Sequence, residues 1–140
     1  MLRTVSAFDE DDLRRENGEL KNRVAQLERV VTIVEASSEA IVSTAVDGTV
    51  LSWNAAAQRL FGFTPGEAVG RSQLELVPFE RLAEHTAAVE RALRGARVVL
   101  ETRRRCKDGR EVNVEVRYAR LVDAGGKVLG LSVFAHVLEV

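Results

Sequence analysis

The sequence predicts an α+β protein in which a long N-terminal helix precedes a domain. The domain contains five antiparallel strands, several short helices and one helix that is longer than these. Two observations carry this prediction: a heptad repeat of apolar residues near the N-terminus, and strand-like runs joined by short glycine-containing turns farther on. The 140 residues, 46% of them hydrophobic, suit one compact domain of about 100 residues plus one long appendage.

The composition limits the classes of partner that we expect. The 20 basic and 21 acidic residues give a net charge of −1, which offers no general attraction to nucleic acid or to a membrane surface. No apolar run reaches the roughly 20 residues of a membrane span, and the polar start, MLRTVSAFDEDD, lacks the apolar core of a signal peptide. The single cysteine, Cys106, cannot form an internal disulfide. We therefore expect a soluble, cytoplasmic protein.

A heptad pattern predicts a parallel, two-stranded coiled-coil helix over residues 13–36, between a flexible N-terminus (1–12) and a domain that spans 37–140. Leucine or valine recurs at alternating spacings of three and four, and one asparagine joins the buried series. Leucine at d positions, β-branched residues at a positions and a paired asparagine all favour a parallel homodimer. The expected interface residues are Leu13, Asn17, Leu20, Val24, Leu27, Val31 and Val34.

The charged positions beside this interface agree with the same frame. In a parallel dimer Glu16 faces the partner's Lys21, and Arg23 faces the partner's Glu28, so both pairs attract. Residues 16–31 resemble the dimerising half of basic-leucine-zipper factors. Because the preceding stretch reads FDEDD instead of a basic region, that resemblance implies dimerisation alone. The alternative is an amphipathic helix that packs on its own domain.

Turn and capping signals define the elements of the domain. An Asp-Gly pair at 47–48 and glycine turns at 107–109 and 124–126 mark three hairpins. Asn54 can cap one short helix, and Thr64 with Glu67 forms the capping box of a second. The expected strands cover 40–46, 49–53, 96–104, 111–122 and 128–137. The expected helices are 55–62, one that starts at Thr64, a turn at 72–77, and 79–93 with Leu82, Val89 and Leu93 on its inward stripe.

This order of elements, together with four of its pieces, resembles the PAS family. The pieces are VDGTVLSWNAAAQRLFGF (46–63), TPGEAVGR (64–71), Pro78 before the longer helix, and the RCKDGREVNVEV hairpin (105–116). The resemblance implies a PAS fold: a five-stranded antiparallel sheet with short helices and one long helix on one face. It also implies a small apolar cavity between the sheet and the long helix, and a role as a bacterial sensor or interaction module.

The end of the last strand bears on how a signal leaves the domain. PAS domains that drive a C-terminal effector commonly finish with an Asp-Ile-Thr signature, and here the corresponding stretch is His136-Val137-Leu138. We therefore expect a signal to pass through the N-terminal coiled coil or to a separate signalling protein. The sequence contains no glycine-rich phosphate loop, no closely spaced metal-ligand set and no nucleophile motif. We accordingly expect a non-enzymatic homodimer with no metal and no cofactor.

The alternative function is a small-molecule sensor that binds haem through His85 or an apolar metabolite in the cavity. Haem-binding oxygen-sensor PAS domains of rhizobial kinases have their proximal histidine at a similar place, and a neutral imidazole can ligate iron. The arginine that such sensors carry on the following strand has no counterpart here, because Leu100 occupies its position. The expected pocket or core residues are Trp53, Phe61, Phe63, Leu76, Val89 and Phe134.

Three further features bear on possible chemistry. Gln73 stands where blue-light PAS domains carry the thiol that attacks flavin, so flavin-adduct chemistry is not expected. Cys106 is expected to be a partly exposed strand residue. The basic residues of one hairpin are expected to form a solvated face, not a nucleic-acid surface, because no aromatic residues interleave with them. These residues are Arg103, Arg104, Arg105, Lys107 and Arg110.

Overall fold

The computed structural model describes residues 38–138. The N-terminus (1–12) and the predicted coiled coil (13–36), with all seven of its expected interface residues, lie outside the described residues. The coiled coil and the division of the chain into 1–12, 13–36 and 37–140 therefore stay predictions.

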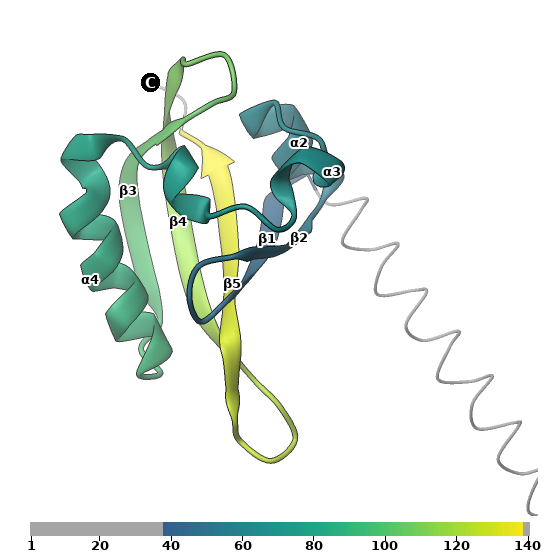
Figure 1. Cartoon of the computed structure of the whole chain (residues 1–140). Coiled ribbons are helices and arrows are strands. Elements are labelled where there is room, and N and C mark those ends of the chain that lie inside the picture. The colour runs from purple at the N-terminus through teal and green to yellow at the C-terminus, as the bar shows by residue number, and fades with distance from the viewer. Residues whose placement is uncertain (1–37, 139–140) are drawn as a thin grey trace, which may run out of the picture. The chain divides into compact units, whose positions relative to one another are not determined.

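The described domain is built on one five-stranded antiparallel sheet in the order β2-β1-β5-β4-β3. The first strand lies beside the last, in a register that pairs Ala40 with Ala135 and Ala45 with Gly130 (Figure 1). The strands are β1 (Ala40–Ala45), β2 (Val50–Trp53), β3 (Val98–Arg105), β4 (Glu111–Val122) and β5 (Val128–Val137). The prediction of five antiparallel strands is confirmed, and the expected bounds of β4 and β5 match those observed.

One glycine allows the two central strands to approach closely. Gly130 has φ +152°, and a Cβ atom built on it would lie 1.8 Å from the backbone oxygen of Thr44. No side chain fits at that distance, so this position in β5 requires glycine.

The helices begin at the capping residues that the sequence indicates. Asn54 accepts a hydrogen bond from the backbone N–H of Ala57 and caps α2 (Ala55–Phe61). Thr64 and Glu67 form the expected capping box of α3 (Pro65–Ala68). The long helix differs from expectation: 79–93 is divided into a 3-10 turn, η2 (Phe79–Arg81), and α4 (Leu82–Leu93). A further 3-10 turn, η1, covers Gln73–Leu76.

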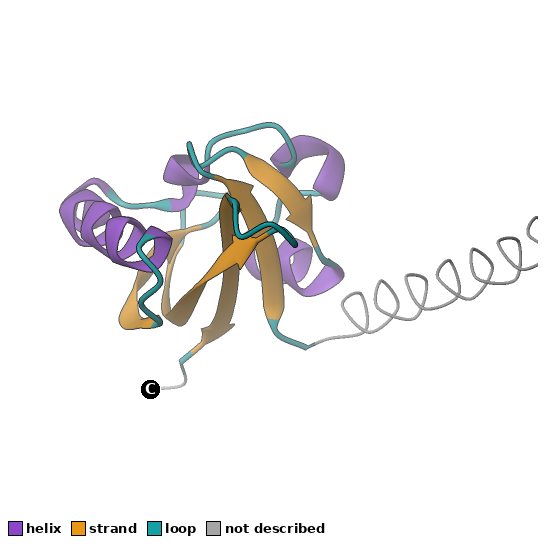
Figure 2. Ribbon diagram, turned by 90° about the horizontal axis from the view of Figure 1, so that it is seen from below, coloured by secondary structure: helices purple, strands orange, loops and turns teal. Residues whose placement is uncertain are grey.

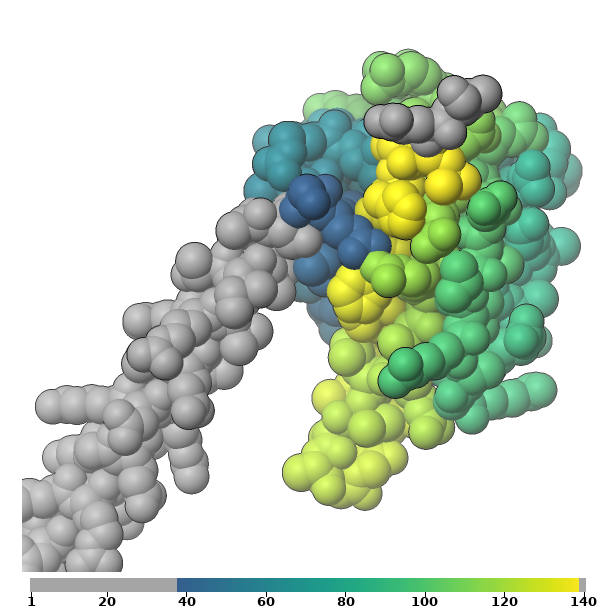
Figure 3. All heavy atoms as spheres, turned by 180° about the vertical axis from the view of Figure 1, so that it is seen from behind, coloured from purple at the N-terminus to yellow at the C-terminus, as the bar shows by residue number. Residues whose placement is uncertain are grey.

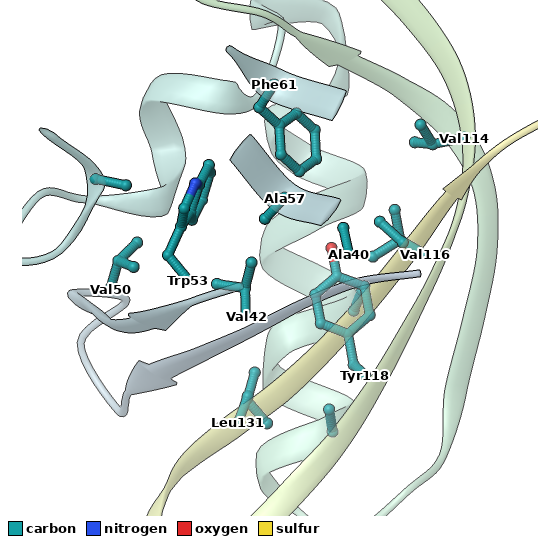
Figure 4. Close-up of a cluster of buried hydrophobic side chains, with 14 of the residues drawn as sticks. Ala40, Val42, Val50, Trp53, Ala57, Phe61, Val114, Val116, Tyr118 and Leu131 are labelled. Carbon is teal, nitrogen blue, oxygen red and sulfur yellow. The ribbon is translucent and has the colours of Figure 1, made fainter. Parts of the chain in front are cut away.

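The helices and the core lie on one face of the sheet (Figures 1 and 2). On that face β4 points Val114, Val116 and Tyr118 inward, each at most 2% exposed, as the predicted alternation requires. Figure 4 shows these side chains in one core with Val42 of β1 and with Ala57 and Phe61 of α2. Full burial of such side chains contributes about 1.5–3 kcal/mol each. Figure 3 shows atoms of β4 and β5 at the surface of the opposite face.

The buried stripe of α4 differs from the predicted one. His85, Ala88 and Ala92 are the buried residues of this helix, whereas Val89 and Leu93 are only partly buried at its margin. Two alanines on the buried stripe let the helix backbone approach the sheet closely. Val89 and Leu93, which were expected on or near the inward stripe, pack against the core at its margin, and His85 lies at its centre with the two alanines.

Candidate functional site

A small cavity, here called the inner cavity, lies between the sheet and α4. Its polar wall consists of Gln73, His85, Arg104 and Tyr118. The space inside is about 30 Å³, which has room for water or for a ligand of a few non-hydrogen atoms. Its apolar wall consists of Val42, Phe61, Leu76, Val77, Val116 and Val133, with Ala135 completing the lining.

Three residues from three elements form a hydrogen-bonded chain along the polar wall. Arg104 of β3 donates from Nη2 to the Tyr118 hydroxyl of β4 at 2.8 Å. The same hydroxyl lies 3.1 Å from Nδ1 of His85 on α4. Because a guanidinium can only donate, the Tyr118 oxygen is the acceptor of the first bond and its own proton can be donated to His85. His85 then carries its proton on Nε2.

Burial sets the charge states of two of these groups. Burial, and to a smaller extent the charge of Arg104, lowers the pKa of His85 from 6.5 to about 4. Burial also raises the pKa of Tyr118, against the opposing effect of Arg104. At neutral pH the imidazole and the phenol are therefore both uncharged, and the guanidinium is the charged group of the polar wall.

Arg104 is only 4% exposed and meets neutral oxygens alone among the described residues. Besides Tyr118, it donates to the Arg103 carbonyl oxygen at 2.9 Å and to the Thr102 hydroxyl at 3.5 Å. Within residues 38–138 no carboxylate lies within ion-pairing distance of it. The inner cavity is thus a mostly apolar space with one buried positive charge in its wall.

This position of Arg104 corrects one prediction. We expected it on a solvated face of the basic hairpin. That expectation is wrong, because β3 continues to Arg105 and its alternation turns Val98, Thr102 and Arg104 inward. The alternation of inward and outward side chains along β3 was the sequence pattern that could have indicated that Arg104 is buried.

The other basic residues of the hairpin lie at the surface beside acidic partners. Lys107 pairs with Glu67 at 2.6 Å, Arg103 with Glu111 at 3.7 Å, and Arg110 with Asp108 at 3.9 Å. The Lys107 partner, aided by the Thr64 backbone, lowers the pKa of Glu67 to about 2. Arg105 is exposed and points away from the core.

The six expected pocket residues divide among different places. Phe61 and Leu76 line the inner cavity. Trp53 and Phe63 lie beside it, where the indole N–H donates to the Phe63 carbonyl oxygen at 2.9 Å and the two rings meet edge to face. Val89 is partly buried on α4 outside the inner cavity.

Phe134 is a correction. It lies on the outer face of the sheet, where the Arg117 guanidinium stands 5.4 Å from its ring centroid. On β5 the inward positions are Leu131, Val133 and Ala135. Because this strand is apolar at nearly every position, the sequence does not show which alternate set faces inward.

The inner cavity does not fit a haem. Cofactor- and drug-sized ligands occupy sites of about 300–1,000 Å³, an order of magnitude above the roughly 30 Å³ found here. His85 does face this space, but its Nδ1 is engaged with Tyr118. Gln73, at the position of the blue-light thiol, is buried and reaches the inner cavity with an amide in place of sulfur.

Cys106 is also buried, contrary to the expectation of partial exposure. Its Sγ lies 3.3 Å from the Leu60 carbonyl oxygen, and burial raises the pKa of the thiol. A protonated, buried thiol is a poor nucleophile.

Within residues 38–138 no cluster of three or more metal-ligating side chains is present. None of the helices in that same range is long and apolar enough to span a membrane.

A five-stranded antiparallel sheet in this order, with helices and a small cavity on one face, defines a PAS-type domain. A family model described as PAS fold matches residues 28–138, and the chain belongs to the PAS family. PAS domains are general signalling and sensor modules and are typically non-catalytic.

Solved structures with the same fold come from diverse organisms. The PAS domain of a Colwellia psychrerythraea protein is 20% identical, with a TM-score of 0.75 over 80% of this chain and 96% of that one. Drosophila melanogaster Cycle PAS-B with bound ethylene glycol is 20% identical, with a TM-score of 0.64 over 71% and 99%. The Rhodobacter sphaeroides LOV protein is 16% identical, with a TM-score of 0.69 over 81% and 67%. Comparison with curated proteins finds no match.

Proposed function

We propose that the chain is a non-enzymatic, homodimeric PAS signalling module that relays its signal through an N-terminal coiled coil or to a separate partner protein. The observation that carries this proposal is the heptad repeat of residues 13–34, which ends shortly before β1 (Ala40–Ala45) begins. Two attractive pairs in the same frame, Glu16 with the partner's Lys21 and Arg23 with the partner's Glu28, support a parallel arrangement.

A route from the inner cavity to the N-terminal segment supports the relay. Tyr118 and Arg117 are neighbours on β4 and point to opposite faces of the sheet. Tyr118 lines the inner cavity, and Arg117 forms an ion pair with Glu39, the residue before β1. His136 of β5 approaches the same carboxylate at 3.5 Å. A shift of β4 at the cavity would therefore reach the point where the N-terminal segment joins the domain.

The oligomeric state of the full chain tests the proposal. We expect sedimentation equilibrium to give a dimer for the natural sequence and a monomer for Leu20→Glu/Leu27→Glu, which places charges in the predicted interface. Asn22→Glu/Gln26→Glu is the matched control, because it adds the same charge on the outer side of the same helix. Circular dichroism checks that the PAS fold persists in both variants. A dimer that survives the interface variant would contradict the coiled-coil proposal.

A second candidate function, small-molecule sensing, is favoured by one specific observation. The inner cavity is a mostly apolar space with a buried, hydrogen-bonded polar wall, and such a combination is typical of ligand sites. Haem is not the expected ligand, because the space is too small. The ultraviolet–visible spectrum after incubation with hemin should show no sharp Soret band that depends on His85. Such a band, lost in His85→Ala, would restore the haem hypothesis.

A further inference from the structure

The inner cavity contains a positive charge that the described protein leaves without a counterion. Arg104 is 4% exposed, and its three hydrogen bonds run to a phenol, a hydroxyl and a carbonyl oxygen. A guanidinium has five N–H donors, so these bonds leave part of its donor capacity unused. A buried charge is costly unless it is paired.

Three carboxylates of neighbouring elements do not pair with Arg104. Glu84 raises the pKa of Tyr118 through its charge, but its ion pair is with Arg81 of the preceding 3-10 turn, η2, at 3.5 Å. Glu111 pairs with Arg103 and Glu67 with Lys107, both outside the inner cavity. The partners of Arg104 inside the domain are therefore neutral.

The remainder of the polar wall is suited to an anion as well. Tyr118 and His85 are uncharged at neutral pH, so neither repels a negative group. Figure 4 shows the Tyr118 hydroxyl on the side of the ring that faces the other core residues, between Val42 and Val116. The guanidinium of Arg104 therefore lies in the wall of a mostly apolar space.

We propose that the inner cavity binds a small organic carboxylate, whose carboxyl group pairs with Arg104 while its short alkyl part contacts the apolar wall. Arginine matches a carboxylate with two parallel N–H donors, which a buried, mostly apolar setting strengthens. The space of about 30 Å³ limits the ligand to a few non-hydrogen atoms. This inference rests on the sensing function and names the class of ligand for it.

Propionate is the probe, and isothermal titration calorimetry on the full chain is the measurement. We expect saturable binding of one propionate per chain, with a dissociation constant between about micromolar and millimolar, as suits so small a ligand. Propionamide has the same shape without the charge, and we expect it to bind at least about tenfold more weakly. Sodium chloride at matched ionic strength should not compete.

Variants of two neighbouring arginines test whether propionate binding requires the buried charge of Arg104 or any positive charge on the strand. Arg104→Met should reduce propionate affinity by about tenfold to a hundredfold, whereas Arg105→Met, the exposed neighbour on the same strand, should leave it unchanged. Tyr118→Phe keeps the ring in the core and removes only the hydroxyl that orients Arg104, so a smaller loss is expected. Circular dichroism of each variant confirms folding.

The outcomes distinguish this inference from the proposals on which it depends. Equal binding of propionamide, or full competition by chloride, would overturn the carboxylate assignment while leaving ligand sensing in place. Propionate binding that persists in Arg104→Met would overturn the role of that residue. Absence of binding by both probes to the folded full chain would overturn the inference, and the dimer measurement would still decide the signalling-module proposal.

Discussion

The two faces of the sheet hold arginines in opposite circumstances. On the outer face, Arg117 is 44% exposed and pairs with Glu39, and Arg103 has Glu111 beside it. On the inner face, Arg104 is 4% exposed and, among the described residues, meets only neutral oxygens. The outer charges are partly exposed and paired, as surface charges usually are. The inner charge costs stability, and a charge kept under those conditions points to a ligand.

The largest expected effect comes from placing the same charge on each face. Val98 is 3% exposed on the inner face, and its neighbour Val99 is 58% exposed on the outer face. We expect Val98→Asp to lower the free energy of unfolding by more than about 4 kcal/mol, because an unpaired carboxylate would be buried. Val99→Asp should cost less than about 1 kcal/mol. Urea denaturation followed by circular dichroism measures both, and equal losses would contradict the assignment of the two faces.

The next largest expected effect is an increase in the free energy of unfolding. Replacing a buried ion pair by well-packed apolar residues is often neutral or stabilises a protein by roughly 1–4 kcal/mol. Because Arg104→Met removes a buried charge that has no carboxylate partner among the described residues, we expect a gain in that range. Arg105→Met, at an exposed position of the same strand, should change the free energy of unfolding by less than about 0.5 kcal/mol. A marked loss of stability in Arg104→Met would mean that Arg104 serves the fold and not a ligand.

The smallest expected effect is a pH dependence of the free energy of unfolding, which arises from His85 on the inner face. The pKa of His85 is about 4 in the folded domain and near 6.5 when exposed, so the unfolded chain binds the proton first. The stabilisation is therefore fully present above pH 6.5 and is lost as pH falls from 6.5 toward 4. At about pH 5 the expected loss of unfolding free energy is about 2 kcal/mol.

Matched histidine variants isolate that dependence. His85→Gln should flatten the change in unfolding free energy between about pH 7 and pH 5, a range above the usual carboxylate pKa values. His136→Gln, on the outer face, should leave the His85 contribution in place. A slope that is unchanged in His85→Gln would show that His85 is not buried as a neutral group.

Local signals predicted most of the fold. The Asn54 cap, the Thr64–Glu67 capping box and the glycine turns act within a few residues, so the sequence shows them directly. The family resemblance supplied the five-stranded sheet. The division of the long helix into η2 and α4 was not predicted.

The polar wall of the inner cavity could not be predicted by the same means. Phe134 was assigned inward because β5 is apolar on both faces, and hydrophobicity alone cannot show which alternate residues of the strand face the core. Arg104 was assigned outward because arginine is seldom buried, although its alternation with Thr102 indicated the inner face. His85 was singled out as a candidate ligand residue, and it does line the inner cavity, but its partner Tyr118 lies 33 positions away, beyond the reach of local patterns.

The most direct test of the central claim is a nuclear magnetic resonance titration that observes the arginine Nε–Hε groups of the full chain. The signal of Arg104 is assigned by its loss in Arg104→Met, and that of Arg105 by its loss in Arg105→Met. We predict that propionate shifts the Arg104 signal with a saturable dependence and leaves the Arg105 signal in place. An Arg104 signal that does not move, or one that moves no more than that of Arg105, would contradict a carboxylate site in the inner cavity.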